Sequence, residues 1–424
     1  MQIQFSPPDI GQEEFKAVQE VLESGWLTTG PKAKEFEKKL AEFCGTQRVA
    51  ALSSGTSALE ICLRLLDIGP GDEVITSAYT YTASASVIYD VGATPVLVDV
   101  APKSYHIDPA AIEKALSKRT KAIIAVDYAG VMCEYNAIRR TVEDHKTLYN
   151  PAAGTLQEAF ETPAVIADAT HSFGAKYFGK TSGQVADFSA FSFHAVKNLV
   201  TGEGGALTWR KGLNLDDDVL YRQIMLLSLH GQTKDALAKT KIGAWEYDIV
   251  EPYYKCNFTD ISAALGLVQL ERYDKLLRRR HEIIEQYNRG IQDICCDAVS
   301  FADPQRLEIG NSDSEARLQL LCHTTEAYSS SGHLYPVRFL GYTQSERDCL
   351  INKMAESQIP CNVHYKPLPL LSAYSNRGFA INQFPYAFEQ YSNEMSIPLH
   401  TLLDSQEIEY ILTKLKELTK ASKK

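Results

Sequence analysis

Short apolar segments alternate with amphipathic segments through the first half of the chain, and this alternation constrains the fold most strongly. The apolar segments predict strands at 49–52, 73–77, 95–100, 122–126 and 164–168. Segments with helical spacing of apolar residues, such as 53–66 and 109–116, lie between them. Strands that alternate with helices form a mostly parallel sheet covered by helices. We therefore expect an α/β protein, and in open α/β sheets ligands bind at the carboxyl ends of strands.

The composition is typical of a soluble enzyme. The chain has 424 residues, of which 45% are hydrophobic and 23% charged, enough for two or three domains. The net charge of -10 argues against a nucleic-acid partner, which calls for a basic surface. We find neither a signal peptide nor a run of 18 apolar residues, and the 9 cysteines have no metal-binding spacing. We expect a cytoplasmic protein without a metal site or a membrane partner.

Lys197 follows a segment of alternating small and aromatic residues, Ser189 to Phe193, which predicts a buried strand. Gly202, Gly204 and Gly205 come soon after it and permit tight turns. Desolvation lowers the pKa of an amine, and a neutral amine can attack a carbonyl to form a Schiff base. The stretch alone leaves open a second interpretation, in which Lys197 merely ends a strand at the surface.

Asp168 ends a second apolar strand, 164–168, at the edge of the sheet where ligands bind. Pyridoxal phosphate needs an acid that keeps its ring nitrogen protonated and a lysine that holds it covalently. An aspartate at a strand end followed by Lys197 near the next strand fits both needs. The two residues together point to this cofactor.

The stretch Ser53–Ser57 lies between strand 49–52 and a helix, and offers N–H groups and a helix dipole to an anion. An ordinary helix cap by Ser53 or Ser54 explains the same residues equally well. Tyr81 lies just beyond strand 73–77, where its ring can stack on a pyridine ring or simply pack in the core.

A set of motifs in order along nearly the whole chain resembles the DegT/DnrJ/StrS family of nucleotide-sugar aminotransferases. Within that family, the chain looks most like the UDP-4-amino-4-deoxy-arabinose aminotransferase group. The motifs are Ser24–Lys32, Ser53–Thr56, Gly69–Thr76, Asp168–His171, Phe191–Asn198, Thr259–Gly266, Val363–Tyr365 and Ser396–Leu399.

The resemblance implies the type I, aspartate-aminotransferase-like fold of pyridoxal-phosphate enzymes. A large domain with a mostly parallel sheet is then followed by a smaller α+β domain. We divide the chain into an N-terminal arm, a large cofactor-binding domain, a connecting helix and a small C-terminal domain. Their predicted ranges are 1–12, 13–258, 259–292 and 293–424.

Two segments depart from the family pattern. Residues 141–163 form an insertion, which we expect to be a surface excursion because loops tolerate insertion. Residues 312–331 are polar and rich in serine, and we expect them to be mobile. In addition, Ser228 stands where the family usually has an arginine.

The resemblance also implies roles for individual residues. Lys197 is the catalytic residue, which binds the cofactor and moves a proton. The residues implied to bind the cofactor are Gly55 and Thr56 at its phosphate, Tyr81 and His171 at its ring, Asp168 at the ring nitrogen, and Ser192. Thr29, beside Thr28, and His364 are implied to lie near the substrate. His194 either contacts substrate or braces its strand.

The resemblance further implies a homodimer with shared active sites. Asn257, with Lys255 as second choice, is expected to reach the cofactor phosphate of the partner subunit. The expected reaction transfers an amino group, from glutamate, to a keto group of a nucleotide sugar, at carbon 4, for polysaccharide or glycan biosynthesis. The alternatives are a sugar dehydratase, although such relatives carry histidine in place of Lys197, and a non-catalytic regulatory or binding homologue.

Overall fold

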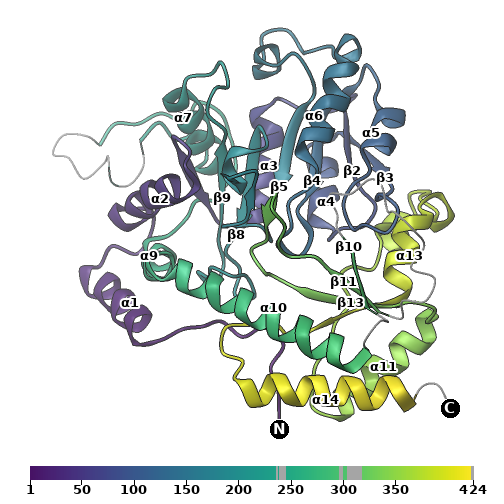
Figure 1. Ribbon diagram of the computed structural model, residues 1–424. Helices are drawn as coiled ribbons and strands as arrows, with labels where there is room; N and C mark the ends of the chain where they lie inside the picture. Colours follow the sequence, from purple (N-terminus) through teal and green to yellow (C-terminus); the bar gives the residue numbers. More distant parts are fainter. Residues whose placement is uncertain (235–236, 238–244, 296–298, 303–317, 422–424) are drawn as a thin grey trace.

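A seven-stranded sheet forms the centre of the computed structural model, which describes residues 1–234, 237, 245–295, 299–302 and 318–421 (Figure 1). The strand order is β1-β9-β8-β5-β4-β2-β3. Strand β9 pairs antiparallel with both neighbours, whereas the other neighbouring strands are parallel. The strands are β1 (Val49–Leu52), β2 (Glu73–Ser77), β3 (Thr94–Val98), β4 (Thr120–Val126), β5 (Ala164–Asp168), β8 (Phe188–Ser192) and β9 (Gly205–Trp209). The predicted, mostly parallel α/β sheet is confirmed.

Both faces of this sheet are buried, which explains why its strands are continuous apolar runs. Along β5, Val165 and Ala167 belong to one hydrophobic cluster, whereas Ala164 and Ile166 belong to a second cluster across the sheet. Helices supply the remaining apolar side chains of the two clusters. These helices include α2 (Pro31–Cys44), α3 (Gly55–Leu65), α4 (Ala83–Asp90), α5 (Pro109–Ala115), α6 (Tyr135–Asp144) and α7 (Asp217–Ser228).

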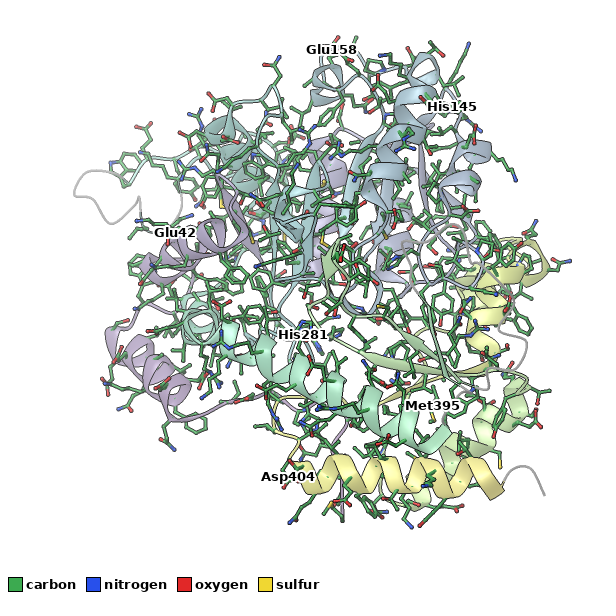
Figure 2. All side chains as sticks on the ribbon, in the orientation of Figure 1. Glu42, His145, Glu158, His281, Met395 and Asp404 are labelled. Atoms are coloured by element: carbon green, nitrogen blue, oxygen red, sulfur yellow. The ribbon has the colours of Figure 1, made fainter. Side chains whose placement is uncertain are left out.

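A second, four-stranded sheet forms the smaller α+β part of the molecule, as predicted. Its order is β10-β11-β13-β14, and Figure 1 shows helices α10 and α14 lying side by side beneath it. Met395 of β14 is fully buried in the core between this sheet and its helices (Figure 2). The elements are β10 (Val299–Ala302), β11 (Leu318–Leu321), β13 (Tyr335–Phe339), β14 (Glu394–Ile397), α10 (Tyr273–Cys295), α11 (Gln344–Glu356), α12 (Ser372–Ser375), α13 (Pro385–Asn393) and α14 (Ser405–Ala421).

The segment predicted as one connecting helix, 259–292, contains two helices. Helix α9 (Asp260–Glu271) is capped by Arg272, and α10 begins at Tyr273. At the other end of the chain, the residues before α1 (Gln12–Ser24) are not loose, because Ile3 is buried in the core of the smaller part. The division into four ranges remains a prediction.

The insertion at 141–163 is anchored to the core rather than being only a surface excursion. It contains two short 3-10 helices, η2 (Lys146–Leu148) and η3 (Leu156–Ala159). Gln157 is buried, and its Nε2 donates to the carbonyl of Leu66 at 2.9 Å. Glu158, one residue further, is exposed at the outer edge of the molecule (Figure 2).

The polar segment 312–331 does not behave as one mobile loop. Residues 312–317 lie outside the described residues, whereas β11 and β12 (Tyr328–Ser329) follow from residue 318 onward. Strand β12 pairs with β6 (Lys176–Tyr177), which in turn pairs with β7 (Lys180–Thr181). Two serine side chains hold the end of this segment: the hydroxyl of Ser331 donates to the carbonyl of His171, and the hydroxyl of Ser330 lies 2.8 Å from Nδ1 of His323.

Gly205 is required where β9 passes the first turn of α3. A Cβ added at Gly205 would lie 2.3 Å from the carbonyl carbon of Ser54, which is backbone and cannot rotate away. We expect Gly205→Ala to lower the free energy of unfolding by about 2 kcal/mol, because overpacking forces the backbone to shift. Chemical denaturation monitored by circular dichroism measures this change.

Gly69→Ala is the matched control, because its added Cβ would meet no atom closer than 3.7 Å. Equal stability of the two variants would contradict the close approach of β9 to α3.

Candidate active site

A cavity of about 550 Å³ lies at the edge of the large sheet where β1, β5 and β8 end. These ends meet because Gly205, the first residue of β9, is paired with both Leu52 of β1 and Ser192 of β8. The sequence-predicted residues that line the cavity are Gly55, Thr56, Tyr81, Asp168, His171, Ser192, His194, Lys197 and His364. Segments far apart in the chain are therefore brought to one place.

The turn before α3 combines both interpretations that the sequence left open. Ser54 caps the helix, because its hydroxyl accepts a hydrogen bond from the N–H of Ser57 at 3.0 Å. Gly55 and Thr56, in the same first turn, line the cavity. The first N–H groups of a helix have no acceptor within the helix, so this turn can bind an anion.

Asp168 is buried at the end of β5, with 4% of its surface exposed. Its Oδ2 accepts a hydrogen bond from the Ser84 hydroxyl at 2.7 Å, and its Oδ1 accepts one from the N–H of Thr170 at 3.3 Å. These bonds fix the carboxyl group at the wall of the cavity. Ser84, from the first turn of α4, was not anticipated from sequence because small helix residues carry no distinctive signal.

Lys197 lies in a tight turn after β8. The N–H of Lys197 donates to the carbonyl of His194 at 2.8 Å, and the N–H of Ala195 donates to the carbonyl of Gly202 at 2.9 Å. Burial lowers the pKa of Lys197 to about 8, although the charge of Asp168 opposes the shift. A fraction of this amine is therefore neutral near pH 7, unlike an ordinary surface lysine.

His171 and His333 lie against each other, with ring centroids 4.2 Å apart. Burial, reinforced by the charge of Lys197, lowers the pKa of both imidazoles well below the ordinary value, so both are neutral at pH 7. The hydroxyl of Tyr365 lies 2.9 Å from Nε2 of His171. Nδ1 of His171 is buried without a hydrogen-bond partner, as is expected of a group that meets a ligand.

Asn198 and Ser331 hold His333 in place. The amide oxygen of Asn198 lies 3.0 Å from Nδ1 of His333, and its amide nitrogen donates to the carbonyl of Ser331 at 2.7 Å. Sequence reasoning missed His333 because it lies in a polar stretch remote from every motif. Tyr365 lies inside the quoted Val363–Tyr365 motif and could have been found there.

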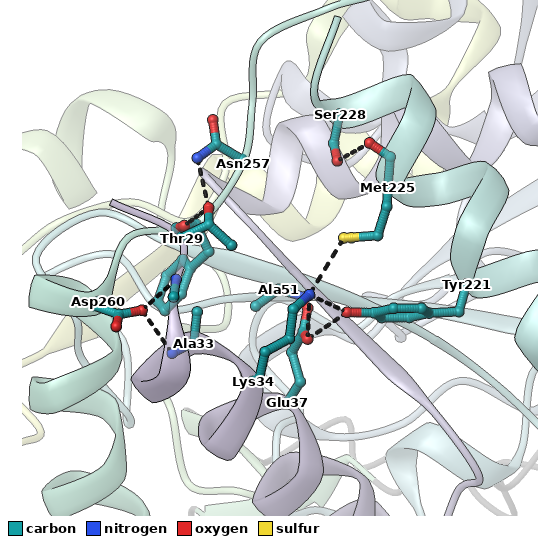
Figure 3. Close-up of polar contacts among 12 residues, drawn as sticks. Thr29, Ala33, Lys34, Glu37, Ala51, Tyr221, Met225, Ser228, Asn257 and Asp260 are labelled. Carbon is teal, nitrogen blue, oxygen red and sulfur yellow. Dashed lines mark hydrogen bonds and ion pairs between the residues drawn. The ribbon is translucent and has the colours of Figure 1, made fainter. Parts of the chain in front are cut away.

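Thr29 and Asn257 lie apart from this cavity, in a second cleft of about 880 Å³ beside α2 and α7. Figure 3 shows the amide of Asn257 donating to the hydroxyl of Thr29, at 2.7 Å. Lys255 is exposed and bonds to the amide oxygen of Asn257. Within one chain, therefore, these predicted residues do not join Lys197.

The same cleft holds a polar cluster that the sequence did not indicate. The hydroxyl of Tyr221 donates to a carboxylate oxygen of Glu37 at 2.6 Å, and Lys34 lies 3.4 Å from that carboxylate (Figure 3). Ser228, at the position of the family's usual arginine, is buried and bonds to the carbonyl of Met225 at 3.2 Å. None of these residues lines the cavity that contains Lys197.

The sequence profile of the DegT/DnrJ/EryC1/StrS aminotransferase family matches residues 8–416. The chain belongs to this family. It is thus a pyridoxal-phosphate-dependent aminotransferase, as predicted from Lys197 and Asp168. Among the described residues, no helix is long and apolar enough to cross a membrane.

Other members of the family are similar to this chain over nearly their whole length. The spore coat polysaccharide biosynthesis protein SpsC of Bacillus subtilis is 34% identical over 424 residues, covering 99% of this chain and 97% of its own. Spr1654 of Streptococcus pneumoniae, described as a sugar aminotransferase, is 45% identical in its PMP form. Its structure has a TM-score of 0.91 and the match covers 99% of this chain and 100% of that one. PseC of Helicobacter pylori, an aminotransferase involved in the biosynthesis of pseudoaminic acid, is 27% identical to this chain. Its structure has a TM-score of 0.82, and the match covers 99% of this chain and 100% of that one.

The lowered pKa of Lys197 leads to a test on the protein freed of cofactor. Acetic anhydride, which reacts with neutral amines, should acetylate Lys197 with a midpoint near pH 8, about 2 units below an ordinary lysine. Asp168→Asn should move this midpoint lower, because the charge of Asp168 favours the protonated amine. Mass spectrometry of the peptide that contains Lys197 measures the midpoint.

Lys176, an exposed lysine, is the internal reference in the same digest. The same midpoint for both lysines would show that the cavity does not desolvate Lys197.

Proposed function

We propose that this enzyme transfers an amino group from glutamate to the keto carbon 4 of a nucleotide sugar, with Lys197 as its catalytic residue. The observation that carries the proposal is the single cavity that joins the desolvated amine of Lys197 to Asp168 and to the anion-binding turn of α3. One cavity thus offers an amine, a carboxylate and an anion site, which are the groups that the cofactor needs.

The residues present fit pyridoxal phosphate. Gly55 and Thr56 would hold the phosphate, Asp168 would face the ring nitrogen, and Lys197 would bind the aldehyde carbon. Tyr81 and His171 would lie against the ring, and the unpaired Nδ1 of His171 offers a contact to its substituents. When bound, the cofactor supplies an electron sink for the charge that a departing proton leaves on carbon.

Lys197 has the second task of moving that proton. An amine with a pKa of about 8 can accept a proton and return it near neutral pH, which is what general acid–base catalysis requires. The carboxylate of Asp168, fixed by Ser84 and Thr170, would stabilise a positive ring nitrogen of the bound cofactor. The buried, neutral histidines keep the cavity from gaining further positive charge that would oppose it.

The proposed substrate class rests on membership of the family and on the names of two relatives. SpsC is named for polysaccharide biosynthesis, and PseC for the biosynthesis of pseudoaminic acid. The stretch Phe191–Asn198 resembles the UDP-4-amino-4-deoxy-arabinose group, which favours a UDP sugar with a keto group at carbon 4. We propose that the reaction takes place in the cytoplasm and that its product is an amino sugar used to make polysaccharides or glycans.

Lys197→Ala should abolish amination, by at least about 10³-fold, because no other group can replace the primary amine. The assay incubates enzyme, pyridoxal phosphate and glutamate with a panel of keto nucleotide sugars and detects the aminated product by mass spectrometry. Lys176→Ala, a change at an exposed lysine, is the control and should retain activity.

Wild-type turnover by Lys197→Ala would assign the chemistry to another lysine. A folded wild-type enzyme that binds pyridoxal phosphate but aminates no sugar would overturn the substrate class. Absence of any reaction with amino acids as well would favour a non-catalytic homologue.

We further propose a homodimer in which Asn257 of one subunit completes the active site of the other. Thr29 and Asn257 line a cleft of their own in the single chain, which a second chain could bring to a cofactor. Asn257 precedes α9, a helix whose polar start and otherwise apolar composition suit an interface. In a symmetric dimer, one interface of this kind builds two equal sites.

Mixing two inactive variants tests shared sites. Lys197→Ala lacks the amine, and Asn257→Asp places a repulsive carboxylate beside the partner's cofactor phosphate. A mixed dimer then contains one site with both defects and one with neither, so up to about a quarter of wild-type activity should return when the chains are mixed equally and exchange randomly. Activity is measured after exchange of subunits, which differently tagged chains verify.

Each parent assayed alone is the control and should be inactive. No recovery despite proven exchange would mean that Asn257 serves its own chain.

A further inference from the structure

His364 is held at the wall of the cavity by residues to which the proposed reaction gives no role. Its chain segment pairs with β14, because the N–H of Asn362 donates to the carbonyl of Ser396 at 3.1 Å and the N–H of Ser396 donates back at 2.8 Å. In this antiparallel register His364 lies opposite Glu394. The N–H of His364 donates to Oε2 of Glu394 at 3.1 Å.

The side chains of the same residues form a relay from the cavity to the core. Nδ1 of His364 lies 3.0 Å from the hydroxyl of Ser396, and that hydroxyl lies 2.6 Å from Oε1 of Glu394. Ser396 and Glu394 are completely buried, whereas His364 lines the cavity. Because Nδ1 is engaged on the core side, the ring has only Nε2 to offer a ligand.

Aromatic rings hold the imidazole on its other sides. Phe5 stacks on His364, with centroids 5.8 Å apart and planes at 22°, and Tyr365 meets it edge-on at 5.2 Å. The arm that carries Phe5 is itself fixed, because the N–H of Ile3 donates to the carbonyl of Gln358 at 3.0 Å. The hydroxyl of Ser6, the next residue, donates to the carbonyl of Val196 at 3.1 Å, beside Lys197.

We propose that Glu394 and Ser396 are positioning residues, which orient His364 so that its Nε2 forms a hydrogen bond with a hydroxyl group of the sugar substrate. The inference rests on the proposed function for the identity of the substrate. The described neighbour of Nε2 is the amide nitrogen of Asn362, at 3.5 Å, the outer limit of a hydrogen bond. A substrate group can readily take its place.

A hydroxyl is the ligand group that suits this relay. Burial raises the pKa of Glu394 to about 8, so its protonated and ionised forms are both present near neutral pH. Ionised Glu394 accepts from Ser396 and leaves the proton of His364 on Nδ1, whereas protonated Glu394 can reverse the relay and leave it on Nε2. A hydroxyl both donates and accepts, so it can pair with Nε2 in either arrangement.

The amino donor needs no hydroxyl contact with His364. A loss of activity with the sugar but not with the amino donor would therefore indicate that Ser396 positions His364 rather than stabilising the fold in general. We expect Ser396→Ala to lower kcat/KM for the keto nucleotide sugar by about tenfold, the effect of one lost hydrogen bond. The reaction of the holoenzyme with glutamate alone, followed by visible absorbance, should change by less than about twofold. In a His364→Gln background, Ser396→Ala should have no further effect on the sugar reaction.

Ser189→Ala is the matched control, because Ser189 is a completely buried strand serine whose hydroxyl bonds to the carbonyl of Ser182. Circular dichroism verifies that each variant folds. Equal losses with glutamate and with sugar in Ser396→Ala, or additive losses with His364→Gln, would overturn the proposal.

A measurement without substrate tests the relay itself. In holoenzyme labelled with nitrogen-15 histidine, Ser396→Ala should shift the Nδ1 resonance of His364 and leave that of His400 unchanged. Unchanged His364 resonances would show that Ser396 does not hold the ring. If these resonances shift but no nucleotide sugar reacts with wild type, the relay stands and the proposed substrate class fails.

Discussion

The pairing of Gly205 with both Leu52 and Ser192 is the constraint on which the site depends. It places the antiparallel strand β9 between two strands that run the same way, so the turn of α3 and the loop of Lys197 emerge side by side. No side chain larger than hydrogen fits there, because the backbone of Ser54 lies where a Cβ would be. The first turn of α3 and the loop that carries Lys197 are therefore positioned by backbone geometry rather than by contacts between their own side chains.

Burial then shifts the pKa values of the side chains that line the cavity. It lowers the pKa of Lys197 to about 8 and keeps His171 and His333 neutral. Charged groups inside such a cavity need hydrogen-bond partners, and Ser84 provides one for Asp168. The same burial that stabilises the fold thus gives Lys197 an amine that exchanges its proton near neutral pH.

The smaller sheet contributes one wall of the cavity and determines what that wall can recognise. His364 and Tyr365 come from the segment paired with β14, and Phe5 comes from the N-terminal arm fixed against the same part of the molecule. Tyr365 reaches across to His171 of the large sheet. The amine of Lys197, which we propose to be catalytic, follows a strand of the large sheet, whereas the groups that we assign to sugar recognition belong to the smaller part.

Local apolar patterns and turn residues specify the strands, the mostly parallel sheet and the residues at strand ends, so these features could be predicted from the sequence alone. Lys197 and Asp168 were identified as candidates in this way, whereas Gly55 was chosen through the family resemblance. Only the tertiary structure brought in Ser84 and His333, whose partners lie 84 and 135 residues away along the chain. It also separated Asn257 and Thr29 from Lys197, and joined Ser396 to His364. Contacts of this kind depend on how elements pack across the fold, and no local pattern of residue types records that packing.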